Sequence, residues 1–260
     1  SQDGATVILA CRISEKGLEA QSIFGQNSKF MELDLADIAS ITAFSKAIHD
    51  NFPKINLLIN NAGVMYPPLT RTTDGFELTF GVNYLGHYML TLQLLDLIQD
   101  VKDARIVNLT SIAANRPKYL DLDNLNAEKG YKKHTAYGTV NLLRLMFAIT
   151  LNEKLSDTGH KAISVAAHPG VARSNLTRHM PFFVKPLIGP FIMSTYRGAI
   201  HILHAALSDH VRGGESWGVD GWREMSGNPK LARVNPLAMQ AELREKAWNL
   251  SAQIAGVDVA

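Results

Sequence analysis

Short apolar runs alternate with longer amphipathic stretches along the chain, and this alternation most constrains the fold. The runs predicted to be strands are Ala5–Cys11, Lys29–Leu33, Ile55–Asn60, Arg105–Leu109 and Ala162–Ala167. The stretches predicted to be helices are Ser14–Ser22, Ile38–Asn51, Thr73–Gln99 with a break inside it, Thr135–Leu155, Arg197–Ser208 and Pro236–Ala255. Because parallel neighbours need a crossover long enough to hold a helix, this order predicts an α/β fold with a doubly wound parallel sheet.

Composition and charge exclude several classes of protein. The 260 residues contain no repeat or linker, so we expect a single domain over residues 1–260. A formal net charge of +2 without a dense basic block argues against a nucleic-acid partner. The single cysteine, Cys11, cannot form an internal disulfide, and no apolar run is long enough to cross a membrane. With no export signal at Ser1, these features predict a cytoplasmic protein.

Small and polar residues follow the predicted strands. Asn60-Asn61-Ala62-Gly63 follows one strand, Ser111 follows another, and His168-Pro169-Gly170 follows a third. Parallel sheets bind their ligands at the carboxyl ends of the strands. We therefore expect the functional site at this edge of the sheet.

These motifs, taken in order, resemble one family. Asn60-Asn61-Ala62-Gly63, Val82-Asn83-Tyr84-Leu85-Gly86-His87, Ser111, Tyr137 and His168-Pro169-Gly170 follow the order of the short-chain dehydrogenase/reductase superfamily. Leu9-Ala10-Cys11-Arg12 and Gly221-Trp222-Arg223-Glu224-Met225 are most similar to its retinol dehydrogenase-like branch. The resemblance covers nearly the whole chain and implies a Rossmann-like fold.

The resemblance implies a catalytic set. Ser111 would hydrogen-bond the substrate oxygen, and Tyr137 would give or take the proton as hydride moves to or from a nicotinamide. Asn83 would help to hold a water in the proton relay. Thr110 competes for the role of Ser111, and a capping hydroxyl at Ser111 or a packing aromatic at Tyr137 is the structural alternative.

The resemblance also implies a cofactor site. Ala62 and Gly63 lack bulk, so a flat cofactor can approach the backbone there. The residues that match the family's cofactor-binding positions are Arg12, Asp34, Leu35, Asn60, Ala62, Gly63, Tyr137, Asn141, Pro169, Gly170, Val171 and Ser174. Arg12 stands where a guanidinium can pair with a 2′-phosphate, which favours NADP(H) over NAD(H) unless Arg12 is an ordinary surface residue. Asp34 is expected at the adenine edge or as the cap of the following helix.

Asn141 departs from the family pattern, which has a lysine four residues after the tyrosine. That lysine hydrogen-bonds the ribose and its charge lowers the tyrosine pKa from about 10, whereas an asparagine can only hydrogen-bond. A nearby opposite charge shifts a pKa by about 1–3 units. Losing the charge therefore lowers the fraction of tyrosinate at neutral pH roughly 10- to 1000-fold. Lys133, four residues before Tyr137, is an alternative source of the charge.

The start of the chain is a second departure. The family opens with a strand and a glycine-rich turn that leads into a helix, but Ser1 comes directly before the expected second strand. The first strand would lie mid-sheet, between Ala5–Cys11 and Ile55–Asn60. A fragment of a longer protein, an altered closure of the sheet and a partner that fills the slot remain as explanations, and we favour the fragment.

The leading functional hypothesis is an NADP(H)-dependent oxidoreductase that interconverts an alcohol and a carbonyl on an apolar small molecule. The alternative is a non-catalytic or impaired relative, because Asn141 replaces the lysine. The proline-rich segment Pro181–Pro190 is expected to form a mobile loop or a lid over the site. His201 and His204 lack a carboxylate at ligand spacing, so no metal site is expected. A homo-oligomer is an open possibility.

Overall fold

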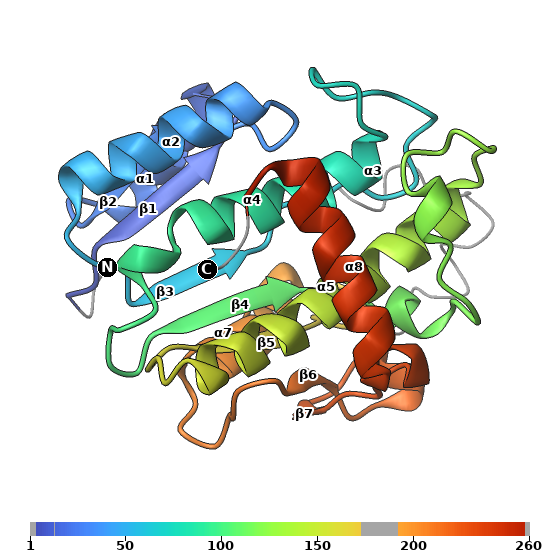
Figure 1. Cartoon of the computed structure of the whole chain (residues 1–260). Helices are drawn as coiled ribbons and strands as arrows, with labels where there is room; N and C mark the ends of the chain where they lie inside the picture. Colours follow the sequence, from blue (N-terminus) through green and yellow to red (C-terminus); the bar gives the residue numbers. More distant parts are fainter. Residues whose placement is uncertain (1–3, 13, 173–191, 258–260) are drawn as a thin grey trace.

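The computed structural model describes residues 4–12, 14–172 and 192–257. The first elements are β1 (Val7–Cys11), α1 (Ser14–Phe24), β2 (Ser28–Glu32), α2 (Ile38–Asn51), β3 (Leu57–Asn60), α3 (Leu78–Phe80) and α4 (Gly86–Gln93). They are followed by β4 (Arg105–Leu109), α5 (Lys133–Asp157), β5 (Ile163–Ala167), α7 (Thr195–Leu207), β6 (Ser216–Val219), β7 (Pro229–Leu231) and α8 (Ala241–Ala255) (Figure 1). No helix in this part of the chain is long and apolar enough to span a bilayer.

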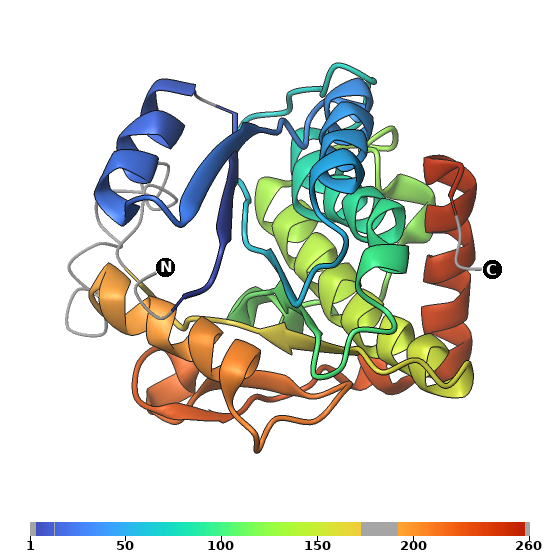
Figure 2. The same cartoon turned by 90° about the vertical axis from the view of Figure 1, so that its left-hand side faces the viewer.

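The larger sheet has five strands in the order β3-β4-β5-β6-β7. Its first four strands are parallel and β7 is antiparallel to β6. In Figure 2, α4 and α5 cover one face of this sheet and α7 covers the other. This is the predicted α/β fold with a doubly wound, mainly parallel sheet.

Alternate residues of the central strands build a core on each face of the sheet. Ile106 and Ala166 belong to the large core on the side of α5. Val107 and Val165, which are their chain neighbours, pack with Ala205 of α7 on the opposite side. Successive side chains of a strand point to opposite faces, so the apolar runs of β4 and β5 fill both cores.

The sheet is divided between β1 and β3. Within the described residues, β1 forms a parallel pair with β2, and β3 forms a parallel pair with β4. No hydrogen-bonded ladder joins β1 to β3 there. The β3 residues Leu57, Leu58 and Ile59 are only half-buried, whereas Ile106 and Val107 of β4 are fully buried. Of the three explanations for the missing first strand, an altered closure of the sheet is therefore not what the structure shows.

Two of the predicted helices differ from those observed. Thr73–Gln99 is not one helix: α3 begins at Leu78, a π-helical turn occupies Gly81–Leu85, and α4 follows. Within Pro236–Ala255, a 3₁₀ turn at Pro236–Met239 ends at Gln240, which has an extended backbone, and α8 begins after it. The strands β6 and β7 have four and three residues, too short for a periodic pattern to reveal them.

Helix packing joins the two-stranded sheet to the rest of the protein. α2 carries Ile41 and Phe44 into the same core as Leu85, which directly precedes α4, and Met89, which lies within α4. Gly86 allows a close approach, because a Cβ there would lie 2.7 Å from the carbonyl oxygen of Leu35. The loop after β2 thus packs directly against the backbone of α4.

Gly86→Ala is expected to destabilise the protein. Overpacking typically costs about 1–3 kcal/mol, which outweighs the gain in helix propensity of about 1 kcal/mol. The control is Gly138→Ala in α5, where the new Cβ would lie 3.3 Å from the nearest atom, the carbonyl oxygen of Ala113. Urea unfolding measures both; a Gly86→Ala protein as stable as the Gly138→Ala protein would contradict this packing account.

Candidate functional site

One stripe of α5 carries the polar residues of the site. Tyr137, Asn141 and Arg144 are four and three residues apart, the spacing that places side chains on one face of a helix. The Asn141 side-chain amide donates to the carbonyl oxygen of Tyr137 at 2.8 Å. The Arg144 guanidinium donates to the carbonyl oxygen of Asn60, the last residue of β3, at 2.8 Å. The stripe therefore faces the carboxyl end of β3.

Tyr137 is surrounded by aromatic and polar groups. Its ring meets that of Tyr66 edge-on at 5.1 Å between centroids, and the Tyr66 ring also meets that of His134 edge-on at 4.3 Å. Arg116 donates to the Tyr66 hydroxyl at 3.0 Å. Burial raises the pKa of Tyr137, while hydrogen bonding by Ser111 and the positive charge of Arg144 lower it.

Ser111 and Thr110 point to different parts of the site. The Thr110 hydroxyl is buried and donates to the carbonyl oxygen of Asn141 at 2.9 Å, so it is committed to α5. Ser111 caps the following 3₁₀ turn by accepting from the N–H of Ala113 at 3.2 Å, and it remains close enough to Tyr137 to lower the pKa of the phenol. The structure brings Ser111, rather than Thr110, to Tyr137.

Asn60 is part of a buried polar ladder. Its side-chain amide donates to Thr91 of α4 at 2.8 Å and to the Asn108 carboxamide oxygen at 2.9 Å. Asn108 in turn donates to Ser164 of β5 at 3.2 Å. Asn60 therefore ties β3 to α4 and β4, while Ala62, two residues later, is exposed.

Asn83 lies in the π-helical turn and holds the segment after β3. Its side-chain oxygen accepts from the N–H of Val64 at 2.7 Å, and its amide nitrogen donates to the Val64 carbonyl at 2.9 Å. A Cβ at Gly63 would lie 3.2 Å from the Asn83 side chain. The stretch Gly81–Leu85 thus forms a π-turn that orients Asn83.

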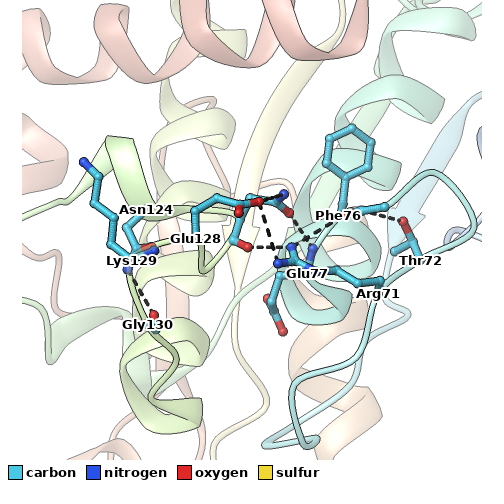
Figure 3. Close-up of polar contacts among 10 residues, drawn as sticks. Arg71, Thr72, Phe76, Glu77, Asn124, Glu128, Lys129 and Gly130 are labelled. Carbon is cyan, nitrogen blue, oxygen red and sulfur yellow. Dashed lines mark hydrogen bonds and ion pairs between the residues drawn. The ribbon is translucent and has the colours of Figure 1, made fainter.

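Two loops are tied together beside the start of α5. Glu77 is 1% exposed, and its carboxylate accepts from two backbone N–H groups at the start of α3. The N–H of Glu77 donates to the Asn126 side chain at 2.7 Å. The Arg71 guanidinium donates to the Asn126 carbonyl at 2.6 Å and lies 3.7 Å from Glu128 (Figure 3). These contacts fix the segment that leads into α5.

The turn after β5 is held by the segment that follows β6. The N–H of Val171 donates to the Met225 carbonyl at 2.7 Å, and Gly170 has a φ of 66° with the same carbonyl beside it. A side chain at Gly170 would collide with that carbonyl. Pro169, Gly170 and Val171 are thus fixed at the carboxyl end of β5, on the same edge of the sheet as Ser111.

Arg12, Asp34 and Leu35 follow β1 and β2. Arg12 is exposed and Leu35 is buried. Asp34 accepts from the N–H of Ala36 at 2.9 Å, whereas the cap of α2 is Asp37, which accepts from Ala39 at 2.8 Å. The alternative role of Asp34 as the helix cap is therefore wrong.

Some expected residues lie outside the described part of the chain, and two others were not anticipated. Ser174 and Pro181–Pro190 fall among the residues that the structure does not describe. Tyr66 and Arg144 are the neighbours of Tyr137 that the sequence analysis did not single out. Arg144 could have been found as the one charge within the apolar stretch Leu142–Met146, whereas nothing in the sequence marks Tyr66.

No group of three or more metal-binding side chains occurs among the described residues. Lys133 is exposed at the first position of α5. The cation that acts on Tyr137 is Arg144.

Comparison with known sequences gives close relatives. The family model described as "short chain dehydrogenase" matches residues 1–121. Retinol dehydrogenase 12 of Mus musculus is 37% identical over 98% of this chain and 79% of its own length. Retinol dehydrogenase 11 of Homo sapiens is 35% identical over 100% of this chain and 80% of its own length.

Comparison with solved structures gives the same fold. An uncharacterised protein from Mycobacterium paratuberculosis has a TM-score of 0.82 and 30% identity, covering 100% of this chain and 87% of its own. A 3-ketoacyl-(acyl-carrier-protein) reductase from Brucella melitensis complexed with NADH has a TM-score of 0.66 and 20% identity. The match covers 86% of this chain and 89% of that reductase. A blue fluorescent protein from a metagenomic library, in complex with NADPH, has a TM-score of 0.65 and 20% identity. The match covers 85% of this chain and 88% of that protein.

Asn83→Ala is expected to lower the free energy of unfolding by about 2 kcal/mol or more, because it leaves the N–H and carbonyl of Val64 without partners. Asn51→Ala is the control, since this exposed asparagine bonds only to the Ala47 carbonyl and its removal should cost no more than about 0.5 kcal/mol. Thermal and urea unfolding of both variants provide the comparison. Equal effects of the two substitutions would rule out the bracing role of Asn83.

Proposed function

Because the chain belongs to the short-chain dehydrogenase/reductase family, in its retinol dehydrogenase-like branch, we propose that it is an oxidoreductase that interconverts an alcohol and a carbonyl compound. The observation that carries the proposal is the placement of Tyr137 beside Ser111 at the carboxyl edge of the sheet. Perturbed pKa values at such an edge are typical of catalytic groups.

The proposed chemistry uses both hydroxyl groups. Ser111 hydrogen-bonds the substrate oxygen and orients it. In reduction, the Tyr137 phenol gives its proton to that oxygen; in oxidation, the Tyr137 phenolate takes the proton from the alcohol. Asn83 positions the neighbouring backbone at Val64, and a role for it in a proton relay stays a prediction.

The carboxyl edge of the larger sheet fits the nicotinamide part of a dinucleotide cofactor. When bound, this group supplies or accepts the hydride. Ala62 and Gly63 present backbone with little bulk, and a side chain at Gly63 would crowd Asn83. Pro169, Gly170 and Val171 would offer a fixed surface on the opposite side. The Asn60 amide already donates to Thr91 and Asn108. Asn60 would therefore support the cofactor surface by holding the end of β3 in place.

Arg12 favours NADP(H) over NAD(H) in this proposal. It is exposed directly after β1, the position at which a carboxylate would bind a ribose 2′-hydroxyl and repel a 2′-phosphate. Asp34 and Leu35 follow the neighbouring parallel strand β2 and would lie along the adenine. Asn141 would approach the nicotinamide ribose, although its amide donates to the Tyr137 carbonyl.

An apolar substrate, a cytoplasmic location and a homo-oligomer are further parts of the proposal. The names of the relatives, which are retinol dehydrogenases, support a long apolar alcohol or aldehyde. The single cysteine is compatible with a reducing compartment.

Tyr137→Phe is expected to reduce turnover of a long-chain aldehyde with NADPH by about 10²- to 10⁴-fold, because it removes the proton donor. Tyr119→Phe, at a tyrosine that is 73% exposed, is the matched control and should leave turnover unchanged. Consumption of NADPH and formation of the alcohol are measured together. If the unsubstituted chain turns over no aldehyde or alcohol in a broad panel, the non-catalytic alternative replaces this proposal.

Arg12→Asp is expected to weaken NADPH binding about 10- to 100-fold while affecting NADH much less, since it removes a charge-assisted hydrogen bond to the 2′-phosphate. Lys54→Asp makes the same change of charge at an exposed residue before β3, at the opposite edge of the sheet, and is the control. Cofactor titration by fluorescence measures both affinities. Equal loss of NADPH and NADH affinity would show that Arg12 does not determine the cofactor preference.

A further inference from the structure

Arg144 is a buried charge without a carboxylate partner among the described residues. It is 6% exposed, and its guanidinium makes one hydrogen bond there, to the carbonyl oxygen of Asn60 at 2.8 Å. Arg244 is buried to the same extent but pairs with the Glu153 carboxylate. Burying a charge without a counter-ion is costly, so the charge of Arg144 calls for an explanation other than stability.

The position of Arg144 relates it to Tyr137. It lies seven residues further along α5, on the stripe that also contains Asn141, and it is fixed at the end of β3. Its charge lowers the pKa of Tyr137 against the larger effect of burial. Burial lowers the pKa of Arg144 itself to about 10, so the guanidinium stays charged at neutral pH.

Asn141 leaves the site without the family's lysine, and the same helix stripe carries a cation one turn later. We propose that Arg144 is a positioning residue for the reaction, which supplies from the seventh position after Tyr137 the positive charge that stabilises the phenolate. The inference rests on the proposed function for its catalytic meaning. Its physical content, an interaction between Arg144 and Tyr137, does not depend on turnover.

The direction of the effect on catalysis follows from the protonation state required. Alcohol oxidation needs the Tyr137 phenolate as a base, whereas carbonyl reduction needs the phenol as an acid. Removing the Arg144 charge therefore slows oxidation more than reduction at neutral pH.

Several other titratable or polar groups surround Tyr137 and Arg144. Tyr66 raises the pKa of Tyr137, and hydrogen bonds from Ser111 and Asn141 lower it. Arg116 donates to the Tyr66 hydroxyl, and His134 contacts the Tyr66 ring. His87 of α4 faces Arg144, and burial together with that charge lowers the pKa of His87 to about 3, so His87 is neutral. Arg144 is thus the cation of this set that acts directly on Tyr137.

The first measurement is the tyrosinate titration of Tyr137 by ultraviolet absorbance. Subtracting the spectrum of the Tyr137→Phe protein removes the contribution of the other tyrosines. The charge is removed by Arg144→Gln, which keeps a donor for Asn60, and by Arg144→Met, an apolar side chain of similar length. We expect Tyr137 to titrate at higher pH in both variants than in the unsubstituted chain.

Rate measurements then connect the interaction to catalysis. At neutral pH, alcohol oxidation is expected to fall about tenfold or more in the Arg144→Gln protein, with a smaller loss of aldehyde reduction. The double substitution Asn141→Lys with Arg144→Gln returns a cation to the stripe and should recover part of the oxidation rate. A structural role of Arg144 would not be rescued by a lysine at position 141.

Arg244→Gln is the matched control, because it removes an equally buried guanidinium from α8. It should leave the pH at which Tyr137 titrates unchanged. An unchanged Tyr137 titration in a folded variant without the Arg144 charge overturns the inference. Failure of both Arg144 variants to fold also overturns it, since Arg144 would then be a structural residue. A shifted titration in a protein without turnover supports the interaction and rejects the proposed function instead.

Discussion

The burial of α5 between the five-stranded sheet and α8 is the constraint on which the rest of the structure depends. Figure 1 shows α5 between the sheet and α8. The sheet supplies Ile106 and Ala166 on one side, and Trp248 of α8 packs against Phe147 on the other. A polar side chain on such a helix must find its partner within the protein. Asn141 and Arg144 do so through the Tyr137 carbonyl and the Asn60 carbonyl, and this fixes Tyr137 relative to β3.

The same arrangement explains how a divided sheet holds together. β1 and β3 share no ladder in the described part of the chain, so the larger core, rather than strand pairing, joins the two sheets. Residues of α2, α4 and α5 form one contiguous core, with Gly86 allowing α4 to approach Leu35. The carboxyl ends of β3, β4 and β5 keep their register, and with it the positions of Asn60, Ser111 and Pro169.

The sequence predicts what depends on periodicity. α2 and β4 have the predicted bounds, because apolar spacing defines one and a short buried run defines the other, whereas the cap of α2 is Asp37 and not Asp34. The π-turn at Gly81–Leu85 includes Asn83, whose partner Val64 lies 19 residues away in the sequence, and β6 is too short to carry a pattern. The missing lysine at Asn141 is visible in the sequence, but whether the charge of Arg144 is solvated or buried depends on contacts with distant segments, such as Asn60 at the end of β3, 84 residues away.

The central claim is that this chain moves hydride between a nicotinamide and a carbonyl carbon, with Tyr137 as the proton carrier. Its most direct test is incubation with NADPH deuterated at the transferring carbon and a long-chain aldehyde, followed by mass spectrometry of the product. The account predicts an alcohol that contains one deuterium on its carbinol carbon, formed by the unsubstituted chain and nearly absent with Tyr137→Phe. An aldehyde recovered without deuterated alcohol, from a folded chain shown to bind NADPH, would contradict it.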